Sequence, residues 1–172
     1  MSCHSYFYAD AKWIEWEHID DHTAFQKSEG YQFLLERLEV ILDSAPRITH
    51  VKLGLDEKDK NPLDAPVTEC VCAYFPSSQD GDAYVRENWL KFQAELAKMP
   101  GVEVQGMAGG WSTEPQTHDG TEGKMFAAFV GWESVDAHLE FRKTEGFGRI
   151  IGLLRGGARG VEVHHTAFTR HT

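Results

Sequence analysis

The chain contains two copies of one segment, and this internal repeat constrains the fold more than any other feature of the sequence. Residues 16–30 (WEHIDDHTAFQKSEG) align without a gap with residues 132–146 (WESVDAHLEFRKTEG), and eight of the fifteen positions are identical. The identical pairs include Trp16/Trp132, His22/His138 and Phe25/Phe141. A repeat of this length indicates that a structural unit has been duplicated.

Each copy is predicted to fold as strand, helix, helix and strand. Residues 125–132 (MFAAFVGW) form an almost continuous apolar run, which is typical of a strand covered on both faces. Residues 5–16 take the same place in the first copy. A helix follows in each copy, and Gly30 and Gly146 are predicted to split it into two pieces. The closing strands are expected at residues 48–55 and 161–169.

The region between the two copies supplies further elements. Residues 56–66 are charged and contain prolines, so they are predicted to form a linker. Residues 67–75 (VTECVCAYF) are rich in β-forming residues, and residues 82–99 carry apolar side chains at helical spacing. A further strand is expected at residues 102–111, followed by a polar loop at residues 112–123.

These elements together predict an α+β fold. From residue 67 onward the order is β-α-β-β-α-β, which is the ferredoxin-like order. Residues 1–55 supply only β-α-β. We therefore expect an N-terminal βαβ half-repeat in residues 1–55, a linker in residues 56–66, and a complete ferredoxin-like domain in residues 67–172.

Charge and cysteine content exclude several classes of partner and site. The net charge is −10, whereas nucleic acids and anionic membranes require a basic patch, so neither is expected as a partner. No basic N-terminal region precedes a long apolar run, and no stretch approaches the roughly 18 apolar residues of a membrane helix, so a cytoplasmic location is expected. Cys3, Cys70 and Cys72 have no disulfide-framework spacing, and the last two are expected to be buried core thiols.

The repeated motif resembles that of the dimeric α/β-barrel superfamily, which includes antibiotic-biosynthesis monooxygenase-like and stress-response A/B-barrel domains. There, a strand ending in tryptophan precedes a short helix with a W-E-S-x-x-A-H-x-x-F pattern, which residues 132–141 match and residues 16–25 repeat. The resemblance implies that two sheets, from two chains or from a tandem duplication, pack face to face into a barrel. Because the first copy begins too late to supply a complete sheet, it needs strands from the second copy or from another subunit, and a homodimer is expected on this ground. A truncated start of the sequence is the alternative explanation.

Two pairs of histidines are candidate catalytic residues. His22 and His138 hold equivalent helical positions, and the resemblance implies acid/base groups or axial haem ligands there. The alternative is that both rings orient a turn or fill the gap between helix and sheet. His50 and His165 lie on the closing strands, where an imidazole that titrates near neutral pH can exchange a proton with a phenol or enol.

Four aromatic residues are candidate binding residues for a flat aromatic ligand, with ordinary core packing as the alternative. They are Tyr74, Trp89, Trp111 and Phe129. Trp16 and Trp132, which end strands, are expected to be structural. His118 is expected to be a solvated loop histidine. The glycine-rich segments 106–110 and 156–160 lack the spacing of a phosphate loop, and no metal or cofactor motif is present, so neither a metal nor a cofactor is expected.

Three functions are consistent with these features. The resemblance implies an enzyme of secondary metabolism that acts on a small polycyclic or phenolic, polyketide-like compound. Its reaction would be a cofactor-free oxygenation, or an acid/base cyclisation or isomerisation, in the barrel cavity. The alternatives are a non-catalytic stress-response or ligand-binding barrel dimer, and a barrel protein that binds haem through a helical histidine. Fold by itself does not choose between them.

Overall fold

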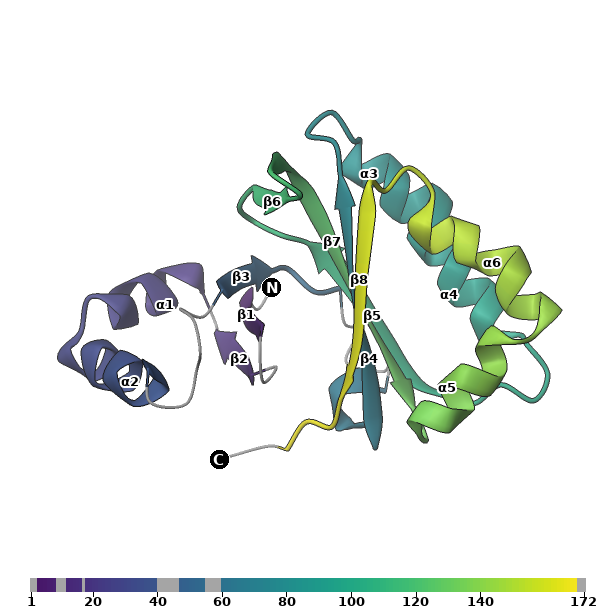
Figure 1. Cartoon of the computed structure of the whole chain (residues 1–172), viewed down its shortest axis with the longest axis horizontal. Coiled ribbons are helices and arrows are strands. Elements are labelled where there is room, and N and C mark those ends of the chain that lie inside the picture. The colour runs from purple at the N-terminus through teal and green to yellow at the C-terminus, as the bar shows by residue number, and fades with distance from the viewer. Residues whose placement is uncertain (1–2, 9–11, 17, 40–46, 55–59, 170–172) are drawn as a thin grey trace. The chain divides into compact units, whose positions relative to one another are not determined.

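The chain folds into two compact units of mixed helices and antiparallel strands, which confirms the predicted α+β class (Figure 1). The computed structural model describes residues 3–8, 12–16, 18–39, 47–54 and 60–169. The units comprise Met1–Leu53 and Gly54–Thr172. The expected domain boundaries at residues 55 and 66 stay predictions. Within the described residues, no helix is both long enough and apolar enough to cross a membrane.

The C-terminal unit is built on a five-stranded antiparallel sheet. Its main strands lie in the order β5 (Val104–Trp111), β7 (Thr121–Trp132), β4 (Val67–Phe75) and β8 (Gly160–Thr166), and β6 (Gln116–His118) pairs with β7. Strand β4, the first of the unit in sequence, therefore lies inside the sheet between β7 and β8. Its nine residues coincide with the strand predicted from composition.

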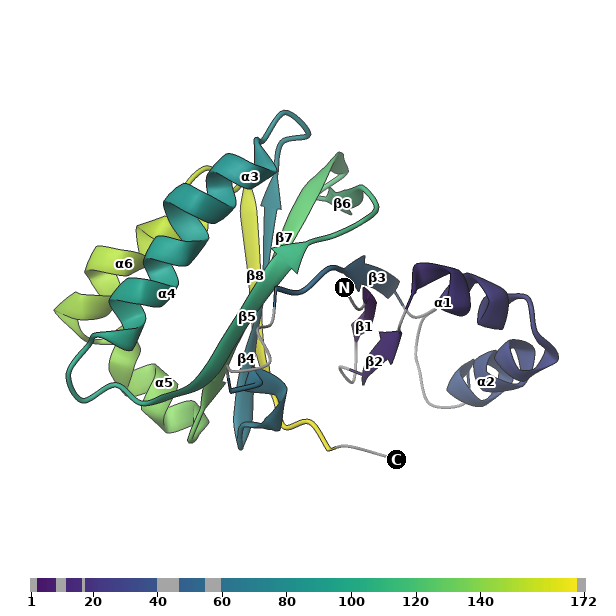
Figure 2. The same ribbon diagram turned by 180° about the vertical axis from the view of Figure 1, so that it is seen from behind.

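The α-helices of this unit lie on one face of the sheet (Figures 1 and 2). One helical segment comprises α3 (Gly81–Tyr84), a π-helical turn (Val85–Trp89) and α4 (Leu90–Ala97), and the other comprises α5 (Val135–Arg142) and α6 (Glu145–Arg155). The core lies between these helices and the sheet. Because strand side chains alternate between faces, β4 and β7 each contribute every second residue to it. Those residues are Val71, Ala73, Phe75, Phe126, Ala128, Val130 and Trp132.

The N-terminal unit contains a three-stranded sheet in the order β2 (Lys12–Trp16), β1 (Cys3–Tyr8) and β3 (Arg47–Val51). Helices α1 (Ile19–Gln26) and α2 (Glu29–Glu39) connect β2 to β3. The single strand expected at residues 5–16 is therefore wrong, because this segment contains two antiparallel strands. An apolar pattern alone does not distinguish one long strand from two that pair with each other.

This hairpin also removes the reason for expecting a homodimer. The first copy was expected to lack the central strand of its sheet, but β1 occupies that place between β2 and β3. The homodimer stays a prediction.

The break between α5 and α6 is made by a side-chain cap and not by the glycine. Helix α6 begins after Thr144, whose Oγ1 accepts a hydrogen bond from the Phe147 N–H at 3.1 Å. Gly146 is the second residue of α6, where an added Cβ would be 2.9 Å from Met99 Sδ. The glycine therefore permits close helix packing, and the predicted position of the break is corrected to Thr144.

The polar loop expected at residues 112–123 contains a hairpin. Asp119 and Gly120 have φ angles of 49° and 71°, which are the positive values of a two-residue turn that joins β6 to β7. His118 precedes this turn, and its ring stacks on Tyr74 at 4.2 Å, with Nδ1 3.4 Å from Glu162 Oε1. The expectation of a solvated loop histidine is therefore wrong, because the hairpin folds His118 back onto the sheet.

Candidate functional site

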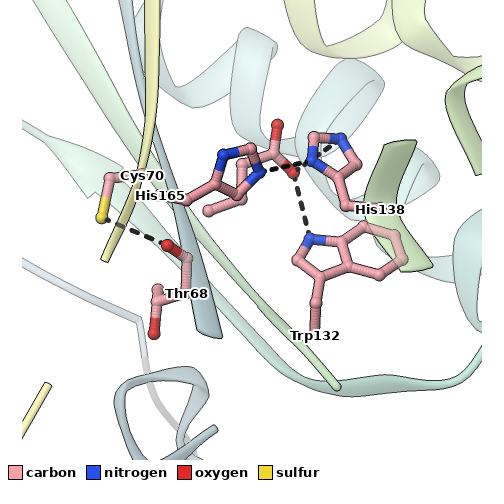
Figure 3. Close-up of polar contacts among 6 residues, drawn as sticks. Thr68, Cys70, Trp132, His138 and His165 are labelled. Atoms are coloured by element: carbon pink, nitrogen blue, oxygen red, sulfur yellow. Dashed lines mark hydrogen bonds and ion pairs between the residues drawn. The ribbon is translucent and has the colours of Figure 1, made fainter. Parts of the chain in front are cut away.

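Four polar side chains meet between the sheet and α5 of the C-terminal unit, and we call them the acid–base cluster. They are Glu69 on β4, Trp132 at the end of β7, His138 on α5 and His165 on β8. His138 Nδ1 lies 2.7 Å from His165 Nε2, and His138 Nε2 lies 3.4 Å from Glu69 Oε2. Trp132 Nε1–H donates to the same carboxyl oxygen at 3.2 Å. Figure 3 shows the two imidazoles turned toward each other, with the indole beside His138.

Strand register and a helix cap bring these four residues together. Glu69 lies directly opposite His165 in the β4–β8 ladder, so both side chains point to the same face of the sheet. Trp132 lies opposite Val67, two residues before Glu69, and shares that face. Ser134 then caps α5, accepting a hydrogen bond from the Ala137 N–H at 3.1 Å. The helix therefore starts immediately after the strand and returns His138 to the sheet.

Burial gives the carboxyl group of the cluster an unusually high pKa. Glu69 is 8% exposed, and burial raises its pKa from 4.5 to about 7. The hydrogen bond from Trp132 and the positive charges of Arg142 and Arg155 act in the opposite direction but are outweighed. Glu69 therefore exchanges its proton near neutral pH, where an ordinary glutamate is fully ionised.

The two imidazoles of the cluster are held neutral. His138 is 2% exposed, and burial, assisted by His165, Arg142 and Arg155, lowers its pKa from 6.5 to about 4. Burial and the charge of Arg142 also lower the pKa of the half-buried His165. Near pH 7 each ring thus has one N–H donor and one nitrogen that accepts, and the pair can take up a proton that arrives at His165.

The N-terminal unit contains the same arrangement of rings. Trp16 stacks on His22 at 4.8 Å and 16°, and Trp132 stacks on His138 at 4.9 Å and 20°. His22 Nδ1 lies 2.5 Å from His50 Nε2. The ring centroids are 4.8 Å apart in the His22–His50 pair and 4.9 Å apart in the His138–His165 pair. The structure therefore brings the four candidate histidines together as two equivalent pairs.

The four candidate aromatic residues do not lie on a single wall. Trp89 and Trp111 pack on Phe126 in the core beneath the helices, with ring centroids 5.5 and 5.2 Å away. Tyr74 and Phe129 belong to the alternate set of strand positions and point to the opposite face of the sheet. Sequence position alone does not reveal this division, because it depends on the register of β4 and β7.

Glu69 is the site residue that the sequence pattern did not bring to notice. A signal for it exists, because it is the only charged residue within the otherwise apolar run VTECVCAYF. Lone carboxylates in apolar strands are rare unless they are paired, so such a residue indicates a polar partner nearby.

Other features of the C-terminal unit lie apart from the cluster. An open groove of about 680 Å³ is lined by polar residues at the end of the sheet, among them Asp80, Glu114 and Lys124, and by Trp111. None of the four residues of the acid–base cluster lines it. On the face that carries Tyr74, Glu162 accepts a hydrogen bond from the Tyr74 hydroxyl at 3.0 Å.

The described residues offer little to a metal ion or a haem. No group of three or more His, Cys, Asp or Glu side chains that could hold a metal occurs within the described part of the chain. Both ring nitrogens of His138 already contact other cluster residues, His165 and Glu69. An iron atom would have to displace one of these two contacts in order to use His138 as an axial ligand.

Comparison with known proteins finds similarity at the level of the fold. Neither the family models nor the curated proteins give a match. A crystal structure described as an anthrone oxidase-like protein matches with a TM-score of 0.63 and 16% identity, over 97% of this chain and 78% of that one. A "putative monooxygenase" from Lactobacillus acidophilus NCFM matches with a TM-score of 0.53 and 10% identity, over 95% of this chain and 75% of that one.

Proposed function

We propose that the chain is a small-molecule enzyme of the oxygenase type that acts on a flat phenolic or polycyclic compound without a cofactor. The observation that carries this proposal is the pair of hydrogen-bonded neutral imidazoles, one buried and the other half-exposed, beside a buried carboxyl group. His165, at the exposed end, accepts the substrate proton. The fold it shares with an anthrone oxidase-like protein and a monooxygenase supports this class of reaction.

The proposed reaction begins with removal of a proton from an activated C–H or O–H group of the substrate. The resulting enolate is electron-rich and reacts directly with O₂, which is the oxidant. For anthrone, the methylene carbon loses both hydrogens and gains one oxygen atom as a carbonyl. The second oxygen atom leaves as water with those two hydrogens, one of which passes through His165. The protein contributes the base and the position of the substrate.

The strand order of the C-terminal unit supports a more specific fold. We propose the ferredoxin-like arrangement, since β4 comes first in sequence and lies inside the order β5-β7-β4-β8. Two such sheets then pack as a barrel, and the N-terminal unit is a shortened duplicate of the C-terminal one. A cytoplasmic homodimer with a small aromatic ligand completes the proposal.

Oxygen uptake by the purified protein with anthrone in air tests the function. His165→Ala is expected to lower the rate by about 10²-fold or more, which is the usual contribution of a general base. His50→Ala makes the same change in the N-terminal unit and is the matched control, expected to leave the rate within a few-fold of the wild type. Equal rates for the wild type and His165→Ala would contradict the proposal.

One observation favours a second candidate, a non-catalytic ligand-binding barrel. The tryptophan–histidine–histidine arrangement occurs in both units with nearly equal distances between ring centroids. This is expected if each histidine pair only stabilises the packing of a helix on a sheet. In that case His50→Ala and His165→Ala lower the melting temperature by similar amounts, and no tested substrate consumes oxygen.

A further inference from the structure

The two units differ in one acidic residue beside an otherwise shared arrangement of rings. When Trp16 is aligned with Trp132, the bounds of α1 and α2 coincide residue for residue with those of α5 and α6. The strands correspond as well, because Cys3 pairs with Trp16 as Val67 pairs with Trp132.

This correspondence identifies the N-terminal counterpart of Glu69. Two residues after Cys3, Ser5 lies opposite His50, just as Glu69 lies opposite His165. The ladder position that bears a carboxylate in one unit therefore bears a serine in the other.

Two arginines near the cluster also differ between the two copies. Arg142 and Arg155 act electrostatically on Glu69 and His138. In the aligned helices their places are taken by Gln26 and Glu39. The two arginines are therefore not repeated at the aligned positions of the first copy.

Packing does not explain the carboxylate. The N-terminal unit forms the same tryptophan–histidine stack and the same histidine–histidine contact with a serine at the ladder position. A buried carboxyl group carries a larger desolvation cost than a serine hydroxyl does. Perturbed ionisable groups of this kind concentrate at functional sites.

We propose that Glu69 is a positioning residue that exchanges a proton with His138 and so sets which nitrogen of His165 carries hydrogen. This inference deepens the proposed function, and only its substrate step rests on that function. The C-terminal unit is then the proton-transferring unit of the chain.

The exchange needs only the His138–His165 and His138–Glu69 contacts described above. With Glu69 ionised, His138 Nε2–H donates to the carboxylate, His138 Nδ1 accepts from His165 Nε2–H, and His165 Nδ1 accepts a new proton. When that proton arrives, the hydrogen on His165 Nε2 moves to His138 Nδ1. The hydrogen on His138 Nε2 then moves to Glu69. One proton has passed to the carboxylate, both rings end neutral, and the reverse sequence returns it.

The surroundings of Glu69 suit such an exchange near neutral pH. Burial brings its pKa to about 7, and the groups that face it are Trp132 on β7, Arg142 on α5 and Arg155 on α6, besides the two histidines. The two arginines stabilise the ionised form, whereas burial stabilises the protonated one. Neither form dominates at pH 7, so the proton can move in either direction.

Nitrogen NMR of the histidine rings, measured between pH 5.5 and 8.5 without substrate, tests the inference. In the wild type, the ring nitrogens of His138 and His165 are expected to change tautomer together, with one midpoint near the Glu69 pKa of about 7. Glu69→Gln removes this transition, and Glu69→Asp restores it. The His22 and His50 rings are the internal control, and Glu69→Gln is expected to leave their signals unchanged.

A second variant guards against loss of folding. Glu69→Ser copies the N-terminal unit, so it is expected to keep the near-ultraviolet circular dichroism of the stacked Trp132 while it loses the tautomer transition. The inference is overturned if the wild-type rings show no transition near pH 7, or if Glu69→Gln or Glu69→Ser retains it.

The same variants separate this inference from the proposed function. A tautomer transition without oxygen uptake by any substrate contradicts the oxygenase proposal and leaves the role of Glu69 intact. Oxygen uptake whose pH profile is unchanged in Glu69→Gln contradicts the role of Glu69 and leaves the oxygenase proposal intact.

Discussion

At the residue scale, the acid–base cluster combines groups whose pKa values move in opposite directions for the same reason. Burial disfavours every charge, so it raises the pKa of Glu69 and lowers that of His138. The two shifts affect stability with opposite signs. The lowered pKa of His138 stabilises the fold above pH 6.5, and this contribution is lost as the pH falls through about 4.

The raised pKa of Glu69 makes stability fall as the pH rises. The folded state holds the proton more tightly than the unfolded state, so this contribution is complete below pH 4.5 and is lost as the pH rises through about 7. Relative to Glu69→Gln, the wild type is expected to lose on the order of 2–3 kcal/mol of unfolding free energy between pH 5 and 8. Urea unfolding of both proteins at the two pH values measures the difference, and parallel pH dependence would contradict it.

At the element scale, replacing glycine by alanine is expected to have opposite effects on stability in the β6–β7 hairpin and in helix α6. Gly120 has a φ of 71° in the turn, whereas Gly148 lies in the interior of α6 with nothing within 4 Å of an added Cβ. Gly120→Ala is expected to cost about 1–2 kcal/mol of unfolding free energy, and Gly148→Ala to add about 0.5–1 kcal/mol. Thermal unfolding is expected to show a lower melting temperature for Gly120→Ala and a higher one for Gly148→Ala. Equal changes in melting temperature for the two variants would exclude the β6–β7 turn.

The start of α6 depends on a single side-chain oxygen. Thr144→Ala removes the acceptor of the Phe147 N–H and is expected to cost about 1 kcal/mol, while Thr144→Ser keeps it. Denaturant unfolding of the three proteins provides the comparison. If Thr144→Ser is as unstable as Thr144→Ala, the methyl group and not the cap holds this junction.

At the scale of the whole molecule, the face of the C-terminal sheet opposite the helices carries apolar side chains. Among them are Cys70, Cys72, Met125 and Phe129. These side chains are at most 3% exposed within the single chain, so their burial does not by itself require a second copy, and the homodimer stays a prediction. Light scattering over a range of concentrations tests the homodimer, with an expected mass of about twice the 19.4 kDa of one chain. A mass of one chain at all concentrations would contradict it.

Local pattern was enough to predict most elements of the C-terminal unit. Val67–Phe75 forms the strand expected of it, and the apolar run 125–132 lies within β7. The helix expected at residues 82–99 is present, although a π-helical turn interrupts it. These predictions succeed because periodicity and propensity act within a few residues along the chain. The β6–β7 hairpin was missed although its Asp-Gly turn is a strong signal.

The sequence by itself determined the repeat, the equivalence of His22 with His138 and of His50 with His165, and the α+β class. Only the tertiary structure decided that each helical histidine contacts a strand histidine, that β1 occupies the centre of its sheet, and that the ladder position of Glu69 is held by Ser5 in the other unit. The reason is physical. A repeat and its side-chain pattern are properties of neighbouring residues, whereas these contacts depend on the register between strands that are distant in the chain. A shift of one residue would place Glu69 on the opposite face of the sheet.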